Sequence, residues 1–196
     1  NEEICNEVIE KSYKLMGSID YLVLNHITNS QYGLWKSHKT HEWLSNMYAV
    51  NTLSYIWLTN SALPYLSSST SSGNIVIISS FAGWVGVPFT ATYSSTKHAL
   101  RGFFNALRTE LELYEENNKI SITICNIGAV NTEGSKEFQS RIQTEWIQPD
   151  SVAKAIIAGS ALRYREVYYP FYVYPTIILH FYFPKFIEWM LKTTMN

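Results

Sequence analysis

The chain has 196 residues, which suits one domain, and a hydrophobic content of 46% is enough for a packed core. The formal net charge of −1 gives no basic excess, which excludes a composition typical of nucleic-acid binding. Only Asp20 and Asp150 supply aspartate carboxylates, and Cys5 and Cys125 lie far apart, so the sequence predicts no metal site.

Helical and strand patterns alternate along the chain, beginning with an amphipathic helical pattern at the N-terminus. A short apolar run at residues 21–24 is typical of a strand buried on both faces. A long helix is expected at residues 41–66. A polar loop then leads to an apolar, β-branched strand at residues 74–80.

The second half of the chain continues this alternation. We expect a helix at residues 92–117, a strand at residues 119–125, a helix at residues 149–162 and a possible last strand at residues 167–169. Strands that alternate with helices form a parallel sheet covered by helices. The expected fold class is therefore α/β, with a doubly wound parallel sheet of Rossmann type.

A glycine-rich phosphate-binding loop does not occur in the sequence. Neither Gly-x-Gly-x-x-Gly nor Gly-x-x-x-Gly-x-Gly is found, and Gly83 and Gly86 do not open a helix in the required way. The chain also begins at Asn1, directly on the helical pattern. We therefore expect a fragment, a partial Rossmann-type sheet that lacks the first strand–helix–strand unit.

Tyr93 and Lys97 form the motif that carries chemistry, Tyr-Ser-Ser-Thr-Lys. Residues four apart on a helix share a face, and a nearby lysine cation is expected to lower the tyrosine pKa, which suits acid–base work. The spacing alone is a weak signal, because Tyr32 and Lys36 repeat it in a loop. Ser80 strengthens it, since it ends a predicted strand, where open α/β sheets bind ligands.

Ser80, Tyr93 and Lys97 resemble the strand-end Ser and Tyr-x-x-x-Lys pattern of short-chain dehydrogenases/reductases, and Asn51 matches the Asn that completes that family's tetrad. Residues 22–29, LVLNHITN, are similar more specifically to the 11β-hydroxysteroid dehydrogenase type 1 group. Four further segments share this resemblance: ALP at 62–64, SSFAG at 79–83, RGFF at 101–104 and EVYY at 166–169.

The resemblance implies an NADP(H)-dependent oxidoreductase that interconverts a ketone and a secondary alcohol on a steroid; a retinoid or another lipophilic carbonyl is the alternative substrate. In such an enzyme Ser80 donates a hydrogen bond to the substrate carbonyl, and Tyr93 delivers a proton to it. Lys97 holds the cofactor ribose and tunes Tyr93, and Asn51 positions a water in a proton relay. Further cofactor contacts are expected from two strand ends: Asn25, His26, Ile27, Val130, Asn131 and Thr132.

The substrate pocket is expected to contain Ser80 and apolar or small neighbours: Phe81, Ala82, Val87 and Phe89. In the type 1 enzymes an aromatic hydroxyl precedes the catalytic tyrosine by six residues; Val87 stands there and removes a polar contact. Each predicted residue also has a structural interpretation. Tyr93 could be a packed aromatic residue of a helix, Asn51 a mid-helix amide that satisfies backbone carbonyls, and His26 a histidine of the core. The four tetrad residues together are harder to explain in this way than any one of them.

Residues 167–196 are expected to form an aromatic-rich C-terminal segment, distinct from a catalytic part at residues 1–166. Prolines interrupt the segment, so it contains no 18-residue apolar run for a transmembrane helix. Its Tyr, Trp and Lys residues suit an interfacial membrane contact, with a dimer contact or a core helix as alternatives. The resemblance implies a homodimer on the lumenal face of the endoplasmic reticulum membrane. A truncated, catalytically silent module that binds a membrane or a partner remains the alternative from another functional class.

Overall fold

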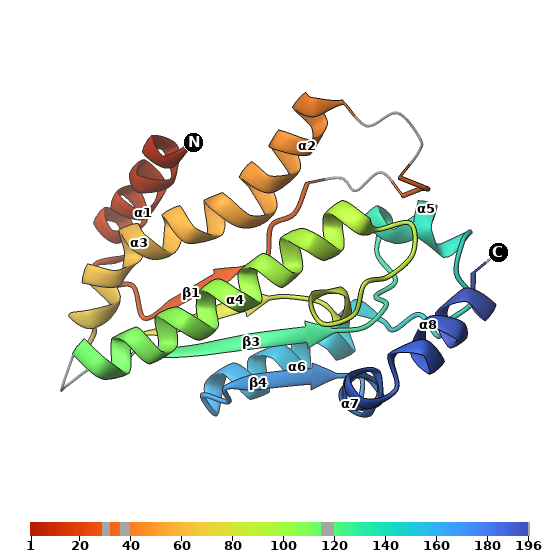
Figure 1. Cartoon of the computed structure of the whole chain (residues 1–196). Coiled ribbons are helices and arrows are strands. Elements are labelled where there is room, and N and C mark those ends of the chain that lie inside the picture. The colour runs from red at the N-terminus through yellow and green to blue at the C-terminus, as the bar shows by residue number, and fades with distance from the viewer. Residues whose placement is uncertain (29–31, 36–39, 115–119, 196) are drawn as a thin grey trace.

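The computed structural model describes residues 1–28, 32–35, 40–114 and 120–195. Its centre is a sheet of four parallel strands in the order β1-β2-β3-β4: β1 (Tyr21–Leu24), β2 (Asn74–Ile78), β3 (Ser121–Ile127) and β4 (Glu166–Tyr169). The arrows labelled β1, β3 and β4 in Figure 1 point toward one edge of the molecule. Because the strands are parallel, their carboxyl ends meet at that edge.

Helices cover both faces of the sheet (Figure 1). Three long helices share one face: α1 (Glu2–Met16), α3 (Ser54–Ser67) and α4 (Ala91–Tyr114). On the other face, α6 (Pro149–Ala161) packs against β3 and β4. This arrangement confirms the predicted α/β class with a parallel sheet of Rossmann type.

Alternation along the strands divides the core between the two faces. Ile75 and Ile77 pack with Leu100 and Phe104 of α4, and all four are fully buried. Val76, between the two isoleucines, points the other way and packs with Val152 of α6. A continuous β-branched run therefore forms a strand here because both of its faces are covered.

The long helix predicted at residues 41–66 is confirmed, with one irregular turn inside it. It consists of α2 (His41–Tyr48), the π-helical turn η1 (Ala49–Leu53) and α3. A π-helical turn inserts an extra residue into a helix and occurs frequently at functional sites. This turn contains Asn51, one of the predicted site residues.

Segments that follow the strands gather at the carboxyl edge of the sheet. They are η2 (Phe81–Gly83) after β2, η3 (Glu133–Ser135) and α5 (Lys136–Gln139) after β3, and α7 (Val173–Tyr182) and α8 (Pro184–Thr193) after β4. In Figure 1, α5, α7 and α8 lie beyond the arrowheads of the strands. Within the described ranges, no helix is both long and apolar enough to cross a membrane.

Element boundaries differ from the prediction at three strands, and β4 begins one residue earlier than predicted, at Glu166. β2 ends at Ile78 because the next residues turn to begin η2. β3 continues beyond the predicted end at residue 125, since its pairing with β4 extends to Ile127. The predicted strand start at Lys119 and the predicted helix end at residues 115–117 lie outside the described residues. β4 crosses the predicted division between residues 166 and 167, and that division stays a prediction.

Candidate active site

Ser80 lies immediately beyond the carboxyl end of β2. The Ser79 amide still donates to the Cys125 carbonyl of β3 (2.9 Å), and the Ser80 backbone is extended (φ −151°, ψ 160°) before η2 begins. The Ser80 hydroxyl accepts a hydrogen bond from the Ala82 amide (3.1 Å), which caps η2. The same hydroxyl also hydrogen-bonds the Tyr93 side chain, so the two groups meet directly at this strand end.

Tyr93 and Lys97 lie one turn apart near the start of α4. Lys97 is 1% exposed, and its Nζ donates to the carbonyl of Ile78 at the end of β2 (2.8 Å). The same Nζ lies 5.7 Å from the centroid of the Tyr93 ring and 5.5 Å from that of Tyr55. The motif therefore faces the strand end that carries Ser80.

Gly83 allows η2 to approach α4 closely. A Cβ at this position would lie 2.9 Å from Ser79 Oγ and 3.1 Å from the carbonyl oxygen of Lys97. Such distances are too short for a side chain in a close-packed interior, so a larger residue would push η2 away from α4. Gly83 thus helps the Ser80 hydroxyl and the Tyr93–Lys97 pair to converge.

Burial dominates the electrostatics of Tyr93 and Lys97. It raises the pKa of Tyr93 to about 12, a rise that the Ser80 hydroxyl opposes and that Tyr32 adds to. It lowers the pKa of Lys97 to about 7. The expectation that Lys97 lowers the pKa of Tyr93 is wrong in this structure, because burial disfavours the phenolate and the ammonium alike.

A cavity of about 570 Å³ occupies the carboxyl edge of the sheet. Most predicted site residues line it: Ser80, Tyr93, Lys97, Asn25, Ile27, Val130, Thr132, Phe81, Ala82 and Val87. These residues come from the ends of three strands and from the start of α4. Four predicted residues lie outside its lining: Asn51, His26, Asn131 and Phe89.

Asn51 and His26 are engaged with neighbouring segments instead. Asn51 is fully buried, and its Oδ1 accepts a hydrogen bond from the Thr28 amide (2.9 Å), which ties η1 to the segment after β1. Its Nδ2 has no hydrogen-bond partner among the described residues. His26 is exposed, its Nε2 lies 2.6 Å from Ser54 Oγ, and its ring packs on Tyr55. The relay role of Asn51 and the cofactor role of His26 stay predictions.

Asn131 and Phe89 do not line the large cavity. The exposed side chain of Asn131 accepts a hydrogen bond from Gln139 Nε2 (3.0 Å). Phe89 adopts a left-handed backbone conformation (φ 66°), and its ring lines a second, much smaller cavity beside Tyr93. The sequence could not predict this reversal, because it depends on the turn that precedes α4.

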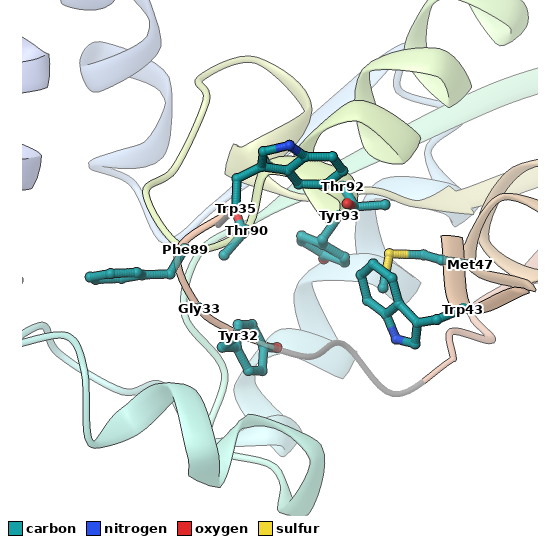
Figure 2. A pocket seen from close by; sticks show the side chains of 10 residues that line it. Tyr32, Gly33, Trp35, Trp43, Met47, Phe89, Thr90, Thr92 and Tyr93 are labelled. Atoms are coloured by element: carbon teal, nitrogen blue, oxygen red, sulfur yellow. The ribbon is translucent and has the colours of Figure 1, made fainter. Parts of the chain in front are cut away.

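The second cavity has a volume of about 10 Å³, room for about one water molecule. Figure 2 shows it between Tyr93 and aromatic or sulfur-containing side chains, among them Tyr32, Trp43 and Met47. Tyr32 belongs to the chance repeat of the Tyr-x-x-x-Lys spacing; its partner in that spacing, Lys36, lies outside the described residues. Tyr32 lines both cavities.

Sequence reasoning missed the outer walls of the large cavity. Tyr32 stacks on Phe138 of α5 (ring centroids 4.6 Å apart), and Phe138 meets Trp146 edge-on. The C-terminal helices and the residues beside them add further missed residues: Tyr172, Val173, Thr176, Met190, Leu191 and Thr194. The end of β3 and α6 add others: Ile127, Gly128, Ala129, Val152, Ala153 and Ile156. The rule that ligands bind at strand carboxyl ends indicates the segments after β3 and β4. It does not indicate which of their residues face inward.

The lining fits one half of a nicotinamide dinucleotide. Lys97 is a buried lysine whose Nζ donates a hydrogen bond to the Ile78 carbonyl, and the ends of β1 and β3 bring Asn25 and Thr132 to the same cavity. These groups suit a nicotinamide and its ribose, whereas the chain has no glycine loop for the pyrophosphate. No cluster of three or more His, Cys, Asp or Glu that could hold a metal ion occurs in the part of the chain that the structure describes.

Comparison with known proteins gives consistent matches. A family model described as short chain dehydrogenase matches residues 1–143. A hydroxysteroid 11-beta-dehydrogenase 1-like protein from Xenopus tropicalis is 36% identical over 188 residues, which cover 95% of this chain and 63% of that protein. The protein of the same name from Gallus gallus is 38% identical over 172 residues, covering 87% of this chain and 58% of that protein.

Two solved structures share the fold. A short chain dehydrogenase from Burkholderia cenocepacia in complex with NADP has a TM-score of 0.79 at 20% identity, covering 97% of this chain and 74% of that one. A short chain dehydrogenase/reductase from Burkholderia phymatum in complex with NAD has a TM-score of 0.81 at 14% identity, covering 95% and 73%. The chain spans 63% and 58% of the length of the two relatives named above. The match over residues 1–143 and these identities show that the chain belongs to the short-chain dehydrogenase family.

Proposed function

We propose that this chain carries the catalytic residues of an NADP(H)-dependent oxidoreductase that interconverts a ketone and a secondary alcohol on a steroid. The observation that supports this most is the convergence of Ser80, Tyr93 and Lys97 at one cavity of about 570 Å³. Elsewhere that cavity is lined largely by apolar and aromatic side chains, which suits a lipophilic substrate.

Tyr93 is the proton donor in this proposal. With a pKa of about 12 it is neutral at physiological pH and holds the proton that ketone reduction needs. An alkoxide is more basic than a phenolate, so the proton moves from Tyr93 Oη to the substrate oxygen as negative charge develops there. Ser80 donates a hydrogen bond to the same oxygen and stabilises that charge.

Lys97 stabilises the phenolate that Tyr93 becomes when it donates its proton. Proton donation leaves a phenolate whose ring centroid lies 5.7 Å from Lys97 Nζ. A lysine with a pKa of about 7 binds a proton readily once a negative charge forms beside it. The cation therefore favours the phenolate over the resting phenol, and such differential stabilisation is what lowers a reaction barrier.

The cofactor supplies or accepts hydride when it is bound. Asn25, Ile27, Val130 and Thr132 are proposed to hold the nicotinamide and its ribose beside Lys97. The preference for NADP over NAD is carried by the resemblance to the type 1 group. The two similar solved structures are described with NADP in one case and with NAD in the other, so the preference needs its own measurement.

We also propose that α7 and α8 contact a membrane surface. Large apolar side chains of this helix pair and its flanks are exposed: Phe171, Tyr174, Ile178, Leu179, Phe181, Tyr182, Phe183, Phe186 and Trp189. Aromatic side chains prefer the headgroup region of a bilayer, and Lys185 and Lys192 can reach lipid phosphates from the same helix. A homodimer and the lumenal face of the endoplasmic reticulum are proposals carried by the resemblance alone.

The function is tested on the protein isolated from its native source, whose intact mass gives the length of the chain assayed. NADPH and NADH affinities are measured by calorimetry, and turnover is compared between cortisone and retinal. Tighter binding of NADPH with faster reduction of cortisone supports the proposal. Faster reduction of retinal would favour a retinoid reductase. Binding of neither dinucleotide and turnover of neither ketone would refute an enzymatic role and favour the catalytically silent module.

The membrane contact is tested by cosedimentation with phosphatidylcholine–phosphatidylserine vesicles. Replacing Phe186 and Trp189 with Ser removes two exposed aromatic anchors and should release the protein from the pellet. Leu113→Ser is the matched control, because Leu113 is 71% exposed on α4, away from this helix pair. Unchanged sedimentation of the double variant, or an equal effect of the control, would rule out a specific contact.

A further inference from the structure

Asn126 is a fully buried amide in the middle of an otherwise apolar strand end. It has 0% exposure, and its neighbours Cys125 and Ile127 are buried in the same strand. Burying an amide costs free energy unless its donor and acceptor are both satisfied. An apolar residue would fill the position at lower cost, so the hydrogen bonds of Asn126 indicate its use.

Both ends of the Asn126 amide are engaged. Its Oδ1 accepts a hydrogen bond from Trp84 Nε1 (3.0 Å), and its Nδ2 donates to Glu166 Oε2 of β4 (2.6 Å). The Arg101 guanidinium carbon of α4 lies 3.0 Å from the centroid of the Trp84 ring. The indole is therefore held at its edge by a hydrogen bond and at its face by a cation.

Trp84 in turn terminates the turn that Ser80 begins. The Trp84 amide donates to the Phe81 carbonyl (3.0 Å) and the Gly83 amide to the Ser80 carbonyl (2.8 Å). The Ala82 amide donates to Ser80 Oγ itself (3.1 Å). Fixing the indole consequently fixes the far end of η2, while Ser80 occupies its near end.

We propose that Asn126 is a positioning residue that holds the Ser80 hydroxyl in place through Trp84. The inference rests on the proposed function, since Ser80 must act on a substrate carbonyl for its position to affect turnover. Asn126 does not line the cavity, so it acts through η2 and not by touching substrate. A small displacement of a reacting group is sufficient to reduce a rate strongly.

The kinetic test is a double-mutant cycle in the full-length protein, assayed with NADPH and cortisone. Asn126→Leu is expected to lower kcat at least tenfold and to leave the KM for NADPH unchanged. In a Ser80→Ala background the same substitution should cause no further loss, because its effect passes through Ser80. Trp84→Phe removes the indole donor and should reproduce the effect. Thr123→Val changes a buried residue of the same strand whose hydroxyl has no described partner, and it should leave kcat unchanged.

Hydrogen exchange supplies a measurement that needs no turnover. Asn126→Leu should accelerate exchange of the Ala82 and Gly83 amides at least tenfold and leave the amides of β2 unchanged. Equal kinetic losses in both Ser80 backgrounds, or exchange that rises uniformly or not at all, overturns the inference. If the native protein reduces no ketone, the proposed function fails, and the exchange result alone decides whether Asn126 holds this turn.

Discussion

Lys97 should make the stability of this protein depend on pH between 7 and 9. Burial lowers its pKa in the folded chain to about 7, whereas a lysine in an unfolded chain has a pKa of about 10.4. Between these values the unfolded state binds a proton that the folded state does not. The free energy of unfolding therefore rises with pH in this window.

The magnitude follows from the difference in bound protons. At pH 7 about half of the folded molecules carry a charged Lys97, and at pH 9 about one in a hundred do, while the unfolded lysine stays almost fully charged. Integrating this difference over the two pH units gives about 2 kcal/mol. Lys97→Met removes the titrating group, so wild type should gain about 2 kcal/mol relative to the variant between pH 7 and pH 9.

Urea unfolding of both proteins at pH 7, 8 and 9 measures this difference. Subtracting one protein from the other removes the contributions of other titrating groups, such as the two buried cysteines. Lys154→Met is the control for the removal of a lysine as such, because Lys154 is exposed on α6. If the difference in free energy of unfolding between wild type and Lys97→Met stays constant within about 0.5 kcal/mol from pH 7 to pH 9, Lys97 does not have the lowered pKa given above.

Three further outcomes are expected. Tyr93→Phe should lower ketone reduction by about a hundredfold or more with NADPH affinity nearly intact, as steady-state kinetics and calorimetry would show; a variant that retains most activity contradicts the assignment. Gly159→Ala should destabilise by roughly 1–3 kcal/mol, because its Cβ would lie 2.3 Å from Val167 Cγ2, whereas Gly102→Ala, with open space, should stabilise by about 0.5–1 kcal/mol in thermal melts. The Cys125 thiol, whose pKa burial raises to about 12, should react with iodoacetamide at pH 8 only after unfolding.

The sheet could be predicted from the sequence because its strands are buried on both faces. The run that forms β2 is β-branched without alternation, and the structure buries Ile75 and Ile77 on one face and Val76 on the other. The end of β3 was harder to predict, because Asn126 is polar and interrupts the apolar pattern. It pairs in the sheet because β4 supplies both its backbone partner Tyr168 and a carboxylate for its amide.

The inner site could be predicted and the outer walls could not, for a physical reason. Ser80, Tyr93 and Lys97 are fixed by local rules, a strand end and a one-turn helical spacing, which hold whatever else packs around them. Val173 and Trp189 belong to one aromatic–aliphatic segment of uniform composition, yet the first is buried at the cavity and the second is 60% exposed. Only the rotation of each helix against the sheet separates them.

The charge states of Tyr93 and Lys97 show the same division between local and tertiary information. Their spacing predicts that a phenol and an ammonium meet, and on that basis the lysine should lower the tyrosine pKa. The fold removes water from both groups, which raises one pKa to about 12 and lowers the other to about 7. Without ligand the favoured pair is thus a neutral phenol and an easily deprotonated lysine. In the proposed reaction, the phenolate left by proton transfer favours a protonated Lys97, whose proton comes from solvent, so burial prepares the pair for the step that the spacing only suggested.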